Sequence, residues 1–166
     1  MTTARLWGPS QIIAVDMVQE RLDIAVKSGV ADIGLNPGKV NVPEAIRELT
    51  GGRGADRTIE AVGAKGTYEL ALDAVRPGGN VSIVGVFEGP QVLPMNTLWI
   101  KNIRISMGLV NANHIPELIR LIQNKKIDMN FLCTHRAPLN DLIRGYEVFG
   151  GKHESILKWV ITPYVK

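Results

Sequence analysis

Apolar runs alternate with helix-spaced apolar residues along the first two thirds of the chain. The β-branched run Ser10–Asp16 predicts a buried strand that ends in an acidic residue. The apolar face of a helix directly after this strand is marked by Val18, Leu22, Ala25 and Val26. Gly29 stands where a glycine commonly ends a helix. The pattern therefore predicts a strand followed at once by a helix.

The same alternation continues to about residue 110. We predict further strands at Ala31–Asn36, Arg57–Gly63, Asn80–Val86 and Ile103–Val110, and helices at Val42–Leu49 and Gly66–Val75. The run Arg76–Gly79 (RPGG) is expected to end the second of these helices. Strands separated by helices at this spacing need right-handed crossovers, which give a parallel sheet with helices on both faces. We therefore predict an α/β fold.

The rhythm changes beyond Gly89. A connection punctuated by prolines leads to two helical patterns and a strand-like end, at Ile115–Lys126, Pro138–Phe149 and Ile156–Val165. The sequence contains no internal repeat and no low-complexity tract.

Composition and charge remove several function classes. The chain is 45% hydrophobic and 21% charged, and its net charge of +3 comes from 19 basic residues that are scattered along it and 16 acidic ones. We therefore expect no nucleic-acid partner. We expect no membrane partner either, because no apolar run approaches the roughly 18 residues that a membrane span needs. The single cysteine, Cys133, allows no internal disulfide and favours a reducing, cytoplasmic location.

Asp16 has the position of an acid that binds ribose in a dinucleotide-binding unit. In such a unit a G-x-G-x-x-G loop precedes the acid by about 20 residues, and the pyrophosphate lies against the helix that follows the loop. Only 15 residues precede Asp16, and the chain contains no G-x-G-x-x-G motif. Residues 1–8 fit the last turns of that helix, so we expect the loop and its strand to fall before Met1.

Four segments, in order, carry a resemblance to a known family: ARLWGPSQIIAVDMVQERLDIAVKSGVADIGLNP, GADRTIEAVG, RPGGNVSIVGV and ESILKWVITP. They resemble landmarks of the zinc-dependent medium-chain alcohol dehydrogenases, over about the C-terminal half of a family member. The resemblance implies an incomplete Rossmann-like, doubly wound parallel sheet that lacks its first strand, with a C-terminal extension of helices and strands. It implies that residues 1–110 form a truncated NAD-binding domain and that residues 111–166 pack on the catalytic domain in the family.

The resemblance also implies an NAD site. Asp16 matches the acid that binds both hydroxyls of the adenosine ribose, and its charge favours NAD over NADP. Arg21 matches a basic position beside the same ribose. From the sequence alone, Asp16 is equally an ordinary strand-end or capping residue, and Arg21 a solvated helix residue.

Two turns complete the implied site. Val62 and Gly63 match the turn after the fourth strand, on the adenosine side of the cofactor. Gly85 and Val86 match the turn after the fifth strand, whose backbone faces the nicotinamide. Both glycines also fit tight turns without any ligand. Looser matches to cofactor contacts are Ser106 and Lys158.

No zinc is expected in this chain. The resemblance implies that the zinc ligands of the family lie before or at the edge of the glycine loop. A zinc site needs three or four protein ligands. The chain offers Cys133, His114, His135 and His153, of which only Cys133 and His135 are close in sequence. Because hydride transfer from an alcohol needs a Lewis acid or a positioned base, we expect no catalytic residue and leave open whether the chain is itself an enzyme.

Three hypotheses about function follow. The first is a partial zinc-type alcohol dehydrogenase, its NAD-binding half, without catalytic competence alone. The second is a non-catalytic nucleotide-binding or dimerisation module, which could associate with a full-length relative. The third is an enzyme completed by another chain that supplies the zinc domain.

The expected loss of the first strand has a structural consequence. That strand is central in a doubly wound sheet, so its loss would leave backbone groups of both neighbours unpaired. We expect Ile156–Ile161, or an equivalent from a second copy, to fill the slot, which would give a strand-exchanged oligomer. The resemblance separately implies a homodimer joined edge to edge through Ile103–Gly108.

Overall fold

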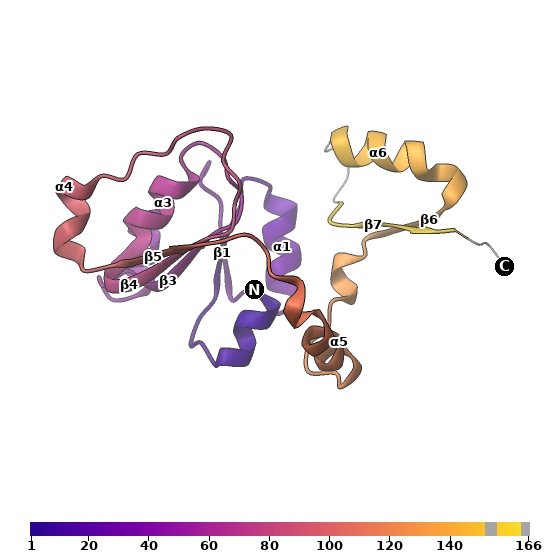
Figure 1. Cartoon of the computed structure of the whole chain (residues 1–166), viewed down its shortest axis with the longest axis horizontal. Coiled ribbons are helices and arrows are strands. Elements are labelled where there is room, and N and C mark those ends of the chain that lie inside the picture. The colour runs from indigo at the N-terminus through magenta and orange to yellow at the C-terminus, as the bar shows by residue number, and fades with distance from the viewer. Residues whose placement is uncertain (152–155, 164–166) are drawn as a thin grey trace. The chain divides into compact units, whose positions relative to one another are not determined.

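The computed structural model describes residues 1–151 and 156–163 (Figure 1). The chain divides into two compact units, Met1–Gly38 with His114–Lys166, and Lys39–Asn113. Every strand pairing among the described residues is parallel, which confirms the predicted α/β fold. Across the described part of the chain we find no helix of the length and apolarity required to traverse a bilayer.

The first unit opens with a strand–helix–strand segment. Its elements are η1 (Thr2–Trp7), β1 (Ile13–Val15), α1 (Gln19–Lys27) and β2 (Ile33–Leu35). β1 pairs with β2 in parallel, with Ile13 opposite Ile33. Leu22 of α1 is 2% exposed and lies against Gly34, which has no side chain to obstruct it. The predicted helix is thus confirmed, and both strands are shorter than predicted because only three residue pairs form the ladder.

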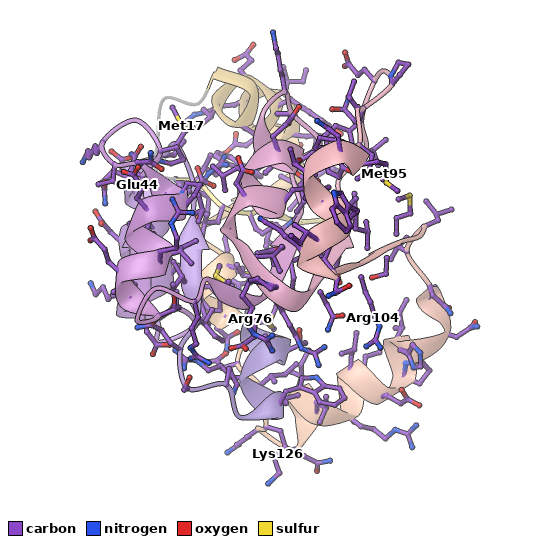
Figure 2. All side chains as sticks on the ribbon, turned by 90° about the vertical axis from the view of Figure 1, so that its left-hand side faces the viewer. Met17, Glu44, Arg76, Met95, Arg104 and Lys126 are labelled. Atoms are coloured by element: carbon purple, nitrogen blue, oxygen red, sulfur yellow. The ribbon has the colours of Figure 1, made fainter. Side chains whose placement is uncertain are left out.

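The second unit holds a three-stranded sheet in the order β3-β4-β5. Its elements are α2 (Val42–Leu49), β3 (Ala55–Glu60), α3 (Thr67–Ala74), β4 (Val75–Ile83), α4 (Met95–Leu98), η2 (Trp99–Lys101) and β5 (Arg104–Met107). α3 lies over one face of this sheet (Figure 1). Figure 2 labels Glu44 at the start of α2, Arg76 on β4 and Met95 on α4. The core between α3 and the sheet consists of Tyr68, Ala71, Leu72, Val75, Val81 and Leu98.

One prediction within this unit is confirmed and one is wrong. The helix ends at Ala74, just before Arg76–Gly79, as predicted, and that run lies inside β4, where the register shifts between Ala55 and Arg57 of β3. Such a bulge absorbs extra residues without ending the strand. The strand predicted to run to Gly63 ends at Glu60, because the main chain turns there.

The C-terminal part of the first unit holds a second small sheet. Its elements are η3 (Ala112–His114), α5 (Ile115–Gln123), η4 (Asn130–Leu132), β6 (His135–Pro138), η5 (Leu139–Asp141), α6 (Leu142–Gly151) and β7 (Trp159–Thr162). β6 pairs with β7 in parallel, and the His135 ring stacks on Trp159 with centroids 5.3 Å apart. We did not predict β6, because His, Arg and Pro in four residues do not form a strand pattern.

The expected replacement of the missing strand from within the chain is wrong. The segment Ile156–Ile161 contributes to β7, whose partner is β6. Among the described strands, β1 pairs only with β2, and β3 only with β4. β7 satisfies its backbone groups locally, with Trp159–Thr162 opposite His135–Pro138. Insertion of a strand from a second copy stays a prediction.

Candidate nucleotide-binding site

The turns after β3 and β4 touch each other. Gly63 has a φ of +76°, and a Cβ atom there would overlap the main chain of Val86. A Cβ atom on Gly85 would overlap the Glu60 carboxylate and the main chain of Gly63. The structure therefore brings together three of the four turn residues singled out by the resemblance, Gly63, Gly85 and Val86, and the fourth, Val62, precedes Gly63 in the chain. Ligands of open parallel sheets bind at the carboxyl ends of the strands, which is where these turns lie.

The Glu60 side chain holds the first of these turns. Glu60 is the last residue of β3, and it is 3% exposed. Its Oε1 accepts hydrogen bonds from the main-chain N–H of Val62 (2.9 Å), from that of Gly63 (2.9 Å) and from the Thr67 hydroxyl (2.8 Å). One carboxylate oxygen thus fixes the main chain from the end of β3 to the start of α3.

The main chain of Glu60 holds the second turn. Its carbonyl oxygen accepts from the N–H of Val84 at 2.8 Å and from that of Gly85 at 3.2 Å. Because the same residue binds both turns, their relative position depends on Glu60.

The hydrogen bonds of Glu60 keep it ionised in spite of its burial. Burial alone would raise the pKa of the Glu60 carboxyl. The N–H groups of Gly63 and Val62 and the Thr67 hydroxyl outweigh burial, and they hold the pKa of Glu60 below its usual range. The second oxygen, Oε2, is buried without a hydrogen-bond partner among the described residues and lies against Gly85.

The surface of the two turns is apolar. The side chains of Val62, Val84 and Val86 are 67%, 60% and 81% exposed. A monomeric protein commonly buries large aliphatic side chains of this kind. These three side chains can contact the face of a flat ring.

Asp16 and Arg21 lie together in the first unit. Asp16 follows β1, and its Oδ1 accepts from the N–H of Val18 at 2.8 Å. Its Oδ2 lies 3.8 Å from Arg21 Nη1, in an ion pair whose side chains are 33% (Asp16) and 44% (Arg21) exposed. The carboxylate is thus oriented by a short local hydrogen bond and keeps an accessible oxygen, which is what a diol of a ribose requires.

The two looser matches have local partners. Ser106 on β5 has its Oγ 3.4 Å from Ser82 Oγ. The carbonyl of Lys158 accepts from the His135 N–H and from the Thr134 hydroxyl, so its main chain serves the β6–β7 sheet.

The described residues do not fit a zinc ion. Over residues 1–151 and 156–163, no group of three or more His, Cys, Asp or Glu side chains could hold a metal. His135 Nδ1 lies 3.1 Å from the Thr134 hydroxyl, and its ring is stacked on Trp159. His153 lies outside the described residues.

Sequence reasoning missed Glu60. The available signal was its phase in the strand, because side chains alternate between the two faces. Val81 on β4 lies opposite Thr58 of β3 and is fully buried. Thr58 is therefore on the inward-facing side of the sheet, and so is Glu60, two residues further along β3. A carboxylate in that phase is rarely buried without partners.

Three comparisons place the chain among known proteins. The sequence profile described as zinc-binding dehydrogenase matches residues 1–124. An alcohol dehydrogenase of Cupriavidus necator is 34% identical over 165 residues, which are 97% of this chain and 45% of that protein. The chain therefore spans about half the length of the curated relatives it matches.

Solved structures agree in fold. A zinc-dependent alcohol dehydrogenase 2 from Streptococcus pneumonia has a TM-score of 0.89 at 33% identity, over 99% of this chain and 48% of that one. An alcohol dehydrogenase from Thermus sp. ATN1 has a TM-score of 0.90 at 34% identity, over 98% of this chain and 47% of that one.

Proposed function

The chain belongs to the zinc-binding dehydrogenase family of oxidoreductases, and from this membership we propose that it forms the nucleotide-binding part of a zinc-type alcohol dehydrogenase. The observation that carries the proposal is the pair of touching turns at the carboxyl ends of β3 and β4. A ligand site at this edge is the general rule for open parallel sheets.

The strand orders support this assignment. A doubly wound nucleotide-binding sheet has the order 3-2-1-4-5-6. The order β2-β1 corresponds to strands 3-2, and β3-β4-β5 corresponds to strands 4-5-6. We therefore infer that these two sheets are parts of an incomplete Rossmann-like sheet that lacks the first strand. Residues 1–110 are its nucleotide-binding domain, and residues 111–166 are the segment that packs on a catalytic domain.

The proposed ligand is NAD. Asp16 accepts hydrogen bonds from the ribose hydroxyls of adenosine, and Arg21 flanks them. The negative charge of Asp16 repels a 2′-phosphate, so NAD binds in preference to NADP. The turn of Val62 and Gly63 contacts the adenosine side, and that of Gly85 and Val86 faces the nicotinamide.

The 166 residues alone do not oxidise an alcohol in this proposal. In this family zinc supplies the Lewis acid that stabilises the alkoxide during hydride transfer. The donors found in the described residues do not fit zinc. Catalysis therefore requires ligands from outside these residues, and the single cysteine supports a reducing cytoplasm as the place where they work.

An assembly module is the second candidate, and exposed apolar surface favours it. One face of α5 exposes Ile115, Leu118, Ile119 and Ile122 by 39–51%. Close to the free edge of β5, Met107 and Leu109 are 73% and 90% exposed. Partners that could cover such surface are a second copy, joined edge to edge or by strand exchange, and a full-length relative.

Binding measurements separate the two candidates. Dissociation constants of NAD and adenosine monophosphate are measured for the wild type, for Asp16→Ala and for the control Asp23→Ala, an exposed aspartate of α1. We expect saturable NAD binding that Asp16→Ala abolishes and Asp23→Ala preserves. Absence of binding by either nucleotide would favour the assembly module.

A further inference from the structure

Glu60 occupies the main-chain donors of both turns. The N–H groups of Val62 and Gly63 donate to its carboxylate, and those of Val84 and Gly85 donate to its carbonyl. Main-chain N–H groups are what proteins commonly offer to phosphate at such turns. These four are already engaged. A ligand at this edge therefore meets the exposed side chains of Val62, Val84 and Val86 rather than a cradle of donors.

The charge of Glu60 acts in the same direction. No lysine, arginine or histidine in the described part of the chain forms an ion pair with Glu60. Its negative charge is stabilised only by hydrogen-bond donors, and it lies directly under Gly85. An anionic group placed on these turns would be repelled, whereas an uncharged ring would not be.

Contacts on two sides restrict the Glu60 carboxylate. Thr67 donates to Glu60 Oε1, and a Cβ atom at Gly85 would overlap Oε2. The carboxylate is therefore held from both sides. A side chain that is shorter than glutamate, or that cannot accept a hydrogen bond, would leave the main-chain N–H groups of Val62 and Gly63 without their acceptor.

We propose that Glu60 is the positioning residue of the site, which fixes both turns and directs this edge toward a planar heteroaromatic ring of the ligand and away from phosphate. The inference rests on the proposed function, because the ligand it positions is the dinucleotide. Two uncharged planar rings of the dinucleotide meet this requirement, the adenine and the reduced nicotinamide. Adenosine and reduced nicotinamide mononucleotide, used as separate probes, distinguish them.

Three variants of the full chain test the proposal: Glu60→Ala, Glu60→Gln and the control Glu69→Gln, an exposed carboxylate on α3. NADH is titrated by its fluorescence, alone and with inorganic phosphate as competitor. Glutamine keeps an acceptor for Val62 and Gly63, so Glu60→Gln should bind NADH within about threefold of the wild type. Glu60→Ala should bind at least about tenfold more weakly.

Competition by phosphate separates positioning from a merely structural role. Glu60→Ala frees two N–H donors and removes a negative charge. Phosphate should therefore displace NADH from this variant at a concentration at least about tenfold lower than from the wild type. A general loss of structure would not create anion binding. The adenosine and reduced nicotinamide mononucleotide titrations then show which ring loses affinity.

Several outcomes overturn the proposal. One is a folded Glu60→Ala that binds NADH as the wild type does, and another is a Glu60→Gln that loses as much affinity as Glu60→Ala. If the wild type itself binds no NADH, the proposed function fails. The positioning role of Glu60 is then tested separately by amide hydrogen exchange. The Val62 and Gly63 amides should be protected in the wild type and in Glu60→Gln, and exchange at least about tenfold faster in Glu60→Ala. Equal exchange in all three would refute the positioning role.

Discussion

Single residues set the geometry of the candidate site. Gly63 has a positive φ and lies where the two turns contact each other. A side chain at Gly63 would be unfavourable for both reasons. Glu60 supplies the hydrogen bonds that keep the approach in place. The resemblance pointed to the glycines, and the structure adds the buried carboxylate between them.

Alanine at Gly63 should destabilise the protein strongly. The left-handed conformation costs a residue with a Cβ about 1–2 kcal/mol, and overlap with the Val86 main chain adds to this. We expect the free energy of unfolding in urea to fall by about 3 kcal/mol or more. Gly89→Ala is the control, because a Cβ there meets open space and its φ is not positive. Equal stability of the two variants would contradict the turn geometry.

Ionisation of Glu60 should make the free energy of unfolding depend on pH. The pKa of Glu60 in the folded protein lies below its pKa in the unfolded chain. Glu60 therefore contributes fully to the free energy of unfolding at a pH above the unfolded pKa, and this contribution is lost as the pH falls through the folded pKa. Asp32 and Asp56 act in the same direction, because hydrogen bonds from Arg5 and Arg76 lower their pKa values.

The variant Glu60→Gln isolates the contribution of Glu60 to the loss of stability in acid. Unfolding free energies of the wild type and the variant, measured from neutral pH down through the ordinary carboxyl range, should show a shallower acid loss in the variant. Parallel curves would mean that Glu60 is not held ionised by its neighbours.

At the scale of elements, periodicity predicted most of the chain and failed where local rules compete. α2 spans Val42–Leu49 as predicted, because its proline and acidic start agree with its apolar spacing. The run Arg76–Gly79 follows the end of α3 as predicted, but it lies within β4 as a bulge between the pairs Ala55–Val75 and Arg57–Asn80, which its turn residues did not indicate. β6 has no strand signal, and its partner β7 lies more than 20 residues away. Tertiary pairing of this kind is not encoded in any short window.

The packing of α6 on the β6–β7 sheet predicts opposite effects on stability for alanine at two glycines of this helix. A Cβ on Gly145 would lie 2.7 Å from Nε1 of Trp159, a buried atom of a ring that is stacked on His135. We expect Gly145→Ala to lower the free energy of unfolding by about 1–3 kcal/mol in spite of its better helix propensity. Gly150→Ala, in the same helix with open space around it, should raise stability by up to about 1 kcal/mol. Circular dichroism during urea unfolding measures both, and equal signs would contradict the packing.

At the scale of the whole molecule, exposed apolar surface is the basis of the proposed assembly. β5 is an edge strand in the described sheet, and Met107 on it is 73% exposed. The sequence could not show which edges stay open, because that depends on strand order rather than on pattern. The candidate residues also fall into two groups, Asp16 with Arg21 in one unit and the two turns in the other.

A charge on this edge should weaken self-association. Lysine on an edge strand opposes pairing with another strand. We expect the wild type to sediment as a dimer and Met107→Lys to raise the dissociation constant of the dimer at least about tenfold. Met95→Lys on α4, at 63% exposure, is the control for added charge (Figure 2). A monomeric wild type, or equal dissociation constants for the two variants, would exclude the β5 edge as the interface.

Titration of the isotope-labelled chain with NAD, followed through its amide resonances, tests the nucleotide-binding assignment most directly. The expected result is saturable change at both groups of candidate residues, Asp16, Arg21, Val62, Gly63, Gly85 and Val86. Spectra that do not change with NAD, or that change only elsewhere in the chain, would contradict it.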